Sequence, residues 1–145
     1  MKVVFSKQAG IDMNSVAVRW QPQVNFTISL LATDPFPDIE LPGFTPRVHV
    51  QVKTVEATRN MTPVVHRIKF VDPESATELE DKKAIGPYRI IYCVDRTMVF
   101  VMSVADKNIV DPYSMHYLNG LAKEYKEYKR LNRPKKKIEK HRKGK

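Results

Sequence analysis

The chain has 145 residues, of which 42% are apolar and 28% are charged, and its formal net charge is +9. These values are typical of one globular domain and argue against wholesale disorder. No apolar run approaches the roughly 20 residues that cross a bilayer, and residues 1–6 become polar too soon for a secretory signal. The single cysteine, Cys93, has no partner for an internal disulfide. We therefore expect a cytoplasmic protein with no membrane partner.

The excess positive charge is concentrated at the C-terminal end of the chain. Residues 121–145 carry 12 Lys and Arg against three Asp and Glu, whereas the first 120 residues carry 13 of each sign. A basic tail can neutralise phosphates and release their counterions, which gives salt-sensitive binding without sequence preference. The same tail could equally be a solubilising, disordered terminus. We assign residues 1–131 to one domain and residues 132–145 to a flexible basic tail, whose candidate RNA contacts are Lys135, Lys136 and Lys137.

The N-terminal third of the chain predicts one strand followed by two helices. Residues 2–5 form the strand, and Ser6 can cap the first helix, which has apolar residues at loosely helical spacing as far as Trp20. Pro22 suits the first turn of the second helix, whose apolar residues recur about once per turn: Val24, Ile28 and Leu31. Four prolines and a glycine within residues 35–46 predict a connector.

The middle of the chain predicts a sheet. Residues 47–53 alternate between valine and polar side chains, which is typical of a half-buried strand, and residues 64–70 can pair with them as a hairpin. Residues 88–94 and 98–104 are apolar and rich in β-formers, which predicts a tight hairpin at the centre of the sheet. Between the two hairpins we expect a loop, in which Lys82 and Lys83 could contact RNA or could simply be exposed. After the sheet, residues 113–131 predict a helix with one apolar stripe.

The alternation of side chains in the strands sorts the basic residues by face. Arg67 and Lys69 share one face of their strand, and Arg89 lies on one face of the next. If the cationic sides coincide, these three residues converge, with Lys107 at the end of the last strand and Tyr113 just beyond it. Burying unpaired charge costs several kcal/mol, so such a face should be open to solvent or to an anion. The alternative is that these are scattered solvent-facing residues of a one-sided sheet.

Three segments of this sheet follow a pattern found in a known family. They read His66-Arg67-Ile68-Lys69-Phe70, then Gly86-Pro87-Tyr88-Arg89-Ile90-Ile91-Tyr92, then Val99-Phe100-Val101-Met102-Ser103-Val104. This pattern resembles the core strands of RelE-type toxins in the RelE/ParE superfamily of type II toxin–antitoxin systems. The family has a Lys-x-Lys strand, a Gly-Tyr-Arg-x-x-Tyr strand and an apolar strand that ends in Gly-Lys-Arg. Here that end reads Ala105-Asp106-Lys107, and Tyr113-Ser114 follows at the family's spacing.

The resemblance covers roughly two thirds of the chain and implies a fold, a reaction and a partner. The implied fold is α+β, with two N-terminal helices packed on a mostly antiparallel sheet of four or five strands, a C-terminal helix and a basic tail. The implied activity is cleavage of ribosome-bound mRNA by attack of the substrate's own 2′-hydroxyl, with no metal or other cofactor. The implied protein partner is a cognate antitoxin.

The resemblance also assigns roles residue by residue. Arg67 and Lys69 stand at the family's two strand lysines, Arg89 at its motif arginine, Lys107 at a catalytic arginine and Tyr113 at the active-site tyrosine. Lys69 or Tyr113 with a lowered pKa would be the base, since neighbouring cations disfavour a protonated lysine. Arg67 and Arg89 would stabilise charge on the phosphorane. Lys107 would neutralise the leaving 5′-oxygen or grip the backbone. Aromatic rings could stack on a splayed base, and the candidates are Tyr113 and Tyr92.

Departures from the family pattern leave two other hypotheses open. Lys107 in place of arginine loses bidentate phosphate geometry, and Asp106 adds negative charge beside it. There is an extra strand around residues 47–53 and a longer segment at residues 71–85. One alternative is a non-catalytic, ParE-like inhibitor of DNA gyrase. The other is a non-toxic, basic RNA- or ribosome-binding protein. The four histidines are scattered and do not predict a metal site.

Overall fold

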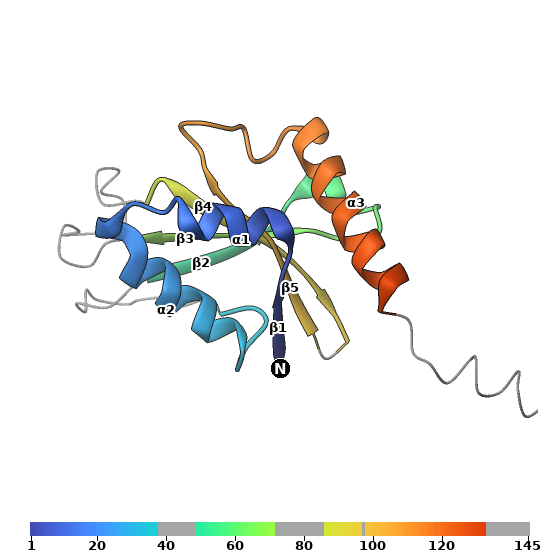
Figure 1. Ribbon diagram of the computed structural model, residues 1–145, viewed down its shortest axis with the longest axis horizontal. Coiled ribbons are helices and arrows are strands. Elements are labelled where there is room, and N and C mark those ends of the chain that lie inside the picture. The colour runs from blue at the N-terminus through green and yellow to red at the C-terminus, as the bar shows by residue number, and fades with distance from the viewer. Residues whose placement is uncertain (38–48, 72–85, 97, 133–145) are drawn as a thin grey trace, which may run out of the picture.

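The computed structural model describes residues 1–37, 49–71, 86–96 and 98–132 (Figure 1). The helices are α1 (Lys7–Asn14), α2 (Gln21–Leu31) and α3 (Met115–Leu131), with short 3-10 turns η1 (Val18–Trp20) and η2 (Glu56–Thr58). The strands are β1 (Lys2–Phe5), β2 (His49–Thr54), β3 (His66–Val71), β4 (Tyr88–Asp95) and β5 (Met98–Asp106). They form one sheet in the order β1-β5-β4-β3-β2. β1 runs parallel to β5 and the other neighbours are antiparallel, so the predicted α+β class is confirmed with a mixed sheet.

The predicted helix cap at Ser6 is confirmed. Its side-chain oxygen accepts a hydrogen bond from the Ala9 amide at 3.0 Å, and its hydroxyl donates to the Met102 carbonyl at 2.8 Å. The predicted length of this helix is wrong, because α1 ends at Asn14 rather than continuing toward Trp20. The break allows both Val16 and Trp20 to enter the core. Helix α2 then begins with proline in its first turn, as predicted.

Ser6→Ala should lower the free energy of unfolding by about 1–2 kcal/mol, measured by urea denaturation. The variant removes the cap of α1 and leaves the buried Met102 carbonyl without its side-chain donor. Ser15→Ala is the matched control, because Ser15 is exposed and its hydroxyl makes only a long 3.4 Å bond to Ile11. Equal losses for the two variants would contradict this role for Ser6.

Buried side chains gather into two clusters, one on each face of the sheet. Cα partners on neighbouring strands share a face, which places Ile68, Ile90 and Val104 together with residues of α1 and α2. The other cluster joins Ile91, Phe100 and further strand residues to the apolar stripe of α3: Leu118, Leu121 and Tyr125. Cys93 lies in this second cluster, fully buried, and burial raises the pKa of its thiol to about 12. Its predicted place in the core is confirmed.

Strands β4 and β5 form the central hairpin that the sequence predicted, with one irregularity. Ile91 pairs with Ser103 and Tyr92 pairs with Val101, so Met102 has no partner and forms a β-bulge. The predicted hairpin of β2 with β3 is also confirmed, although residues 47 and 48 lie outside the described part. Within the described part, no helix combines the length and apolar character that a membrane span requires.

Candidate nucleic-acid interface

The register of the sheet brings basic side chains onto one face. Lys53 of β2 is the direct partner of Arg67 of β3, and Lys69 lies two residues farther along the same strand. Arg67 is in turn the partner of Ile91, which lies two residues from Arg89 on β4. Residues two apart on a strand point to the same side. Four cations from three adjacent strands therefore occupy one face, as the alternation predicted for Arg67, Lys69 and Arg89.

Electrostatic interactions extend this set to the segment after β5. The pKa of Lys69 lies below its ordinary value of 10.5, first because of burial and then because of four cations nearby: Arg67, Arg89, Lys53 and Lys107. Burial also lowers the pKa of Arg67, while Tyr113 acts on it in the opposite direction. We call Lys53, Arg67, Lys69, Arg89 and Lys107 the cation cluster. Four of the residues predicted to be catalytic belong to this cluster: Arg67, Lys69, Arg89 and Lys107. The fifth, Tyr113, lies beside it.

The cluster has a buried floor and an exposed rim. Arg67 is 8% exposed and Arg89 is 4% exposed, whereas Lys53 and Lys107 are exposed. Lys69 is intermediate and Tyr113 is 39% exposed. The expectation of a fully open cationic face is therefore wrong for the two arginines, which are covered. An anion could therefore contact the exposed lysines of the cluster, Lys53 and Lys107.

Neutral oxygens hold the two buried arginines. The Arg89 Nη1 donates to the carbonyl oxygens of Gly86 at 2.7 Å and Tyr88 at 3.0 Å. The Arg67 Nη1 donates to the backbone and side-chain oxygens of Gln51 at 3.3 and 3.4 Å. Across the described ranges, none of the cluster cations forms a salt bridge with a carboxylate. The guanidinium groups are therefore fixed in place without being neutralised by the described residues.

Lys69→Met should raise the free energy of unfolding at pH 7, because burial of the charged amine and the cations around it both disfavour protonated Lys69. The folded-state pKa of Lys69 lies below that of the unfolded chain. At pH values between these two pKa values, Lys69 is protonated more often in the unfolded chain than in the folded protein. The free energy of unfolding of the wild type therefore rises as the pH rises toward 10.5. The difference between the proteins should therefore shrink from pH 7 to pH 10 in urea titrations. A constant difference, or a destabilised variant at pH 7, would contradict the lowered pKa of Lys69.

Gly86 positions Arg89 and has no room for a side chain. A Cβ atom there would lie 2.6 Å from the Phe70 ring, which is fully buried. Gly86→Ala should cost about 1–3 kcal/mol of unfolding free energy in urea titrations, because the ring or the backbone must shift. Gly120→Ala is the control, since its Cβ meets open space on α3. Gly120→Ala should stabilise the protein by about 0.5–1 kcal/mol. If Gly120→Ala destabilised the protein more than Gly86→Ala, the close contact between Gly86 and Phe70 would be contradicted.

The segment between β5 and α3 is held by a hydrogen bond to the residue before β4 and by bonds within the segment. The Lys107 amide donates to the Pro87 carbonyl at 2.9 Å, which ties the start of the segment to the entry of β4. The Asp106 carboxylate accepts from the Asn108 amide at 2.9 Å, and the Asp111 carboxylate accepts from the Tyr113 amide at 3.0 Å. Asp106, which departs from the family pattern, therefore forms a turn here.

The sequence prediction missed Lys53 and was wrong about Tyr92. The alternation of residues 47–53 already placed Lys53 on the polar side, and the register of the β2–β3 hairpin would have revealed it. Tyr92 is fully buried on the opposite face from Arg89, its Oη donates to the Pro35 carbonyl at 2.7 Å, and burial raises its pKa. It cannot stack on a base. The other predicted RNA contacts lie outside the described residues: Lys82, Lys83, Lys135, Lys136 and Lys137.

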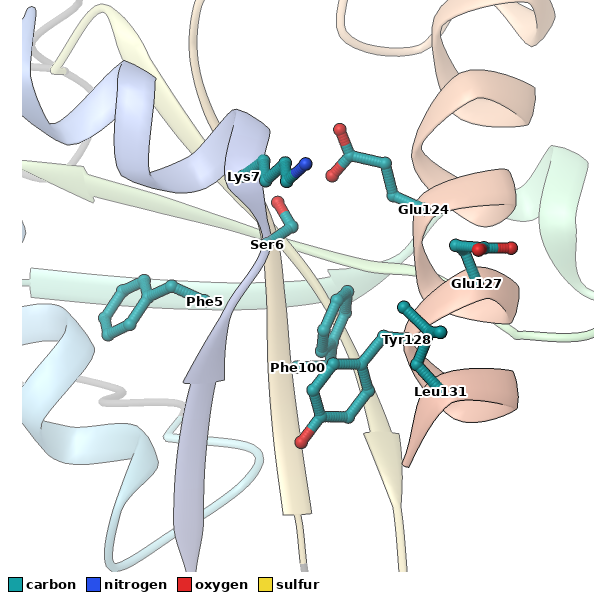
Figure 2. Close-up of a pocket in the computed structure, with 8 residues that line it drawn as sticks. All are labelled: Phe5, Ser6, Lys7, Phe100, Glu124, Glu127, Tyr128 and Leu131. Atoms are coloured by element: carbon teal, nitrogen blue, oxygen red, sulfur yellow. The ribbon is translucent and has the colours of Figure 1, made fainter. Parts of the chain in front are cut away.

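A separate cavity of about 380 Å³ lies between the β1–α1 junction and α3 (Figure 2). Its walls are mainly apolar, and none of the cation cluster lines it. The lining residues are Phe5, Ser6, Lys7, Phe100, Glu124, Glu127, Tyr128 and Leu131. The Phe100 and Tyr128 rings lie 5.1 Å apart, whereas Phe5 points away from them (Figure 2). This cavity therefore belongs to the packing of α3 rather than to the cationic face.

Comparisons with protein-family models, curated proteins and solved structures found no match. In the part of the chain that the structure describes, no group of three or more His, Cys, Asp or Glu is placed to hold a metal ion.

Proposed function

We propose that this chain is a RelE-type toxin, an endoribonuclease that cleaves mRNA, including ribosome-bound mRNA, and that is paired with a cognate antitoxin. The single observation that carries the proposal is the cation cluster with Tyr113 beside it, lacking a carboxylate partner among the described residues. The strand motifs around Arg67, Lys69 and Arg89 supply the second line of support.

The charge balance of the cluster favours an anionic ligand. Lys53 and Arg67 lie directly opposite each other on paired strands, an arrangement that destabilises a sheet when the charges are alike. A phosphodiester between them would turn this repulsion into attraction. Arginine offers a planar fork for phosphate oxygens, and lysine offers a point charge. The cluster contains both types.

The same groups can perform cleavage through the 2′-hydroxyl. A lysine with a lowered pKa is more often neutral, so Lys69 Nζ is the base that takes the 2′-hydroxyl proton. The 2′-oxygen then bonds to phosphorus and the bond to the 5′-oxygen breaks, which leaves a 2′,3′-cyclic phosphate. Arg67 and Arg89 stabilise the charge that builds on the phosphorane oxygens. Protonated Lys107 supplies a proton to the leaving 5′-oxygen, and Tyr113 stacks on a neighbouring base.

Induced expression of the wild type should arrest growth and produce cut mRNA, both of which Lys69→Met should abolish. Loss of a general base is expected to slow cleavage by about 10²–10⁴-fold. Lys123→Met is the matched control, because Lys123 is exposed on α3 and lies outside the cluster.

The outcomes of that experiment separate the other hypotheses. Growth arrest with intact mRNA would point to the gyrase inhibitor. Binding of RNA or ribosomes without arrest or cleavage, lost on deletion of residues 133–145, would point to the non-toxic binder. Arrest and cleavage by Lys69→Met at the wild-type rate would contradict Lys69 as the base.

A further inference from the structure

A partly buried hydrogen-bond network lies beside the cation cluster and contains none of its members. The Ser103 hydroxyl donates to the Asp12 carboxylate at 2.8 Å and lies 2.5 Å from the Tyr117 Oη. A serine hydroxyl has one hydrogen, so Tyr117 must be the donor in the second bond. The Val104 amide and the Gln8 side chain also donate to Asp12, at 2.9 and 2.7 Å. The network therefore joins α1, β5 and α3.

The network closes the base of the segment that carries Lys107 and Tyr113. This segment arches from the end of β5 to the start of α3 (Figure 1). Ser103 precedes Lys107 by four residues and Tyr117 follows Tyr113 by four residues, so the bond between Ser103 and Tyr117 ties the two flanks together. The β-bulge at Met102 sets the register in which Ser103 pairs with Ile91, on the face of the cluster.

We infer that Asp12, Ser103 and Tyr117 form a positioning clamp that holds the segment between β5 and α3, and with it Lys107 and Tyr113, against the cation cluster. The consequence for cleavage rests on the proposed function, whereas the clamp itself does not. None of the three residues would touch RNA. Asp12 orients the Ser103 hydroxyl, and Ser103 in turn presents its oxygen to Tyr117.

Tyr117 packs at the edge of the second core cluster, and its hydrogen bond to Ser103 adds to that packing in fixing its position. Its side chain is only half-buried, and a cavity of about 240 Å³ lies next to it. The cavity is lined by Gln8, His116, Tyr117, Gly120, Leu121 and Glu124. Without the bond to Ser103, the ring has space to move, and the first turn of α3 can move with it.

Tyr117→Phe tests the clamp, with Tyr128→Phe as the matched control on the same helix. Among the described residues, the Tyr128 hydroxyl has no hydrogen-bond partner, although its ring packs on Phe100. We expect amide hydrogen exchange at Ile109, Val110, Tyr113 and Ser114 to become about tenfold faster in Tyr117→Phe, with β4 unchanged, because one local bond is lost. Ser103→Ala should speed exchange at the same four amides and leave β4 unchanged. A uniform rise across the sheet, or exchange equal to that of the control, would overturn the inference.

Cleavage kinetics test the consequence for the site. Tyr117→Phe should cleave an ordinary RNA about tenfold more slowly than wild type, if one hydrogen bond positions the segment. The loss should shrink on an RNA with sulfur at the bridging 5′ position, because a thiolate leaves without a proton from Lys107. An equal loss on both substrates would overturn the link between the clamp and the position of Lys107. If the wild type cleaves neither RNA, the proposed function fails, and the exchange experiment still decides the clamp.

Discussion

Arg89→Ala is expected to slow RNA cleavage by about 10²–10³-fold, because the phosphorane would lose a fixed cation in a water-poor site. Arg89 is 4% exposed, and the carbonyl oxygens of Gly86 and Tyr88 both accept hydrogen bonds from its Nη1. Arg89→Lys keeps the charge and loses the fork, so it should retain more activity than alanine and less than wild type. Cleavage of a defined mRNA under single-turnover conditions measures the effect.

Arg130→Ala is the control for Arg89→Ala. Arg130 is exposed on α3 and pairs with Glu127, so its loss should leave the cleavage rate unchanged and cost less than about 1 kcal/mol of stability. Arg89→Ala also leaves two carbonyls without their donor, at a cost of about 1–3 kcal/mol, so a urea titration must show that the variant is folded. Full activity in a folded Arg89→Ala protein would contradict a catalytic role for Arg89.

Phe100→Ala should have the largest effect on stability, a loss of about 3–5 kcal/mol in the free energy of unfolding. Phe100 is 1% exposed and lies between the sheet and α3, with its ring 5.4 Å from Tyr125 and 5.1 Å from Tyr128. Its removal leaves a hole beneath the helix whose first turn bears Tyr117. Urea denaturation followed by circular dichroism measures the loss.

Phe5→Ala is the control for Phe100→Ala. Phe5 lines the same cavity but is 44% exposed and points away from Phe100 (Figure 2). Its truncation should cost less than about 1.5 kcal/mol, since nearly half of the side chain stays in water in the folded protein. Similar losses for the two variants would mean that α3 is not held through Phe100.

Local patterns predicted most of the secondary structure, and tertiary packing decided the rest. Ser6 and Pro22 mark the starts of α1 and α2 because capping and proline geometry act over one turn of helix. The end of α1 at Asn14 was not predictable in this way, because Val16 and Trp20 leave the helix to fill the core. The parallel pairing of β1 with β5 and the bulge at Met102 also depend on contacts between distant parts of the chain.

The candidate site was predictable to the extent that it follows from alternation in strands. Period two alone placed Arg67 and Lys69 on one face, and the pairing of β3 with β4 was needed to show that Arg89 joins them. Burial of the arginines was missed, since it depends on bonds to carbonyls of Gln51, Gly86 and Tyr88. Tyr92 lies three residues from Arg89 on the same strand and therefore on the opposite face, so alternation already argued against stacking of Tyr92 on RNA beside Arg89.

The clamp residues were missed for a different reason. Asp12, Ser103 and Tyr117 lie on α1, β5 and α3, far apart in sequence, and no spacing between them could have suggested hydrogen bonds. The place of Tyr117 on the apolar stripe of the helix predicted over residues 113–131 indicated that its ring packs on the sheet or on a segment of an antitoxin, and gave no sign of the bond to Ser103. A polar network of this kind becomes visible once the tertiary structure places its members together.

The most direct test is cleavage of a ribosome-bound mRNA, and of the same RNA free in solution, with one 2′-deoxynucleotide at the mapped cut site. The wild-type protein should cut the all-ribose RNA to leave a 2′,3′-cyclic phosphate, and should leave the substituted position intact. Cutting at the deoxy-substituted position would contradict activation of the 2′-hydroxyl by the cation cluster. Failure to cut either RNA, on or off the ribosome, would contradict it as well.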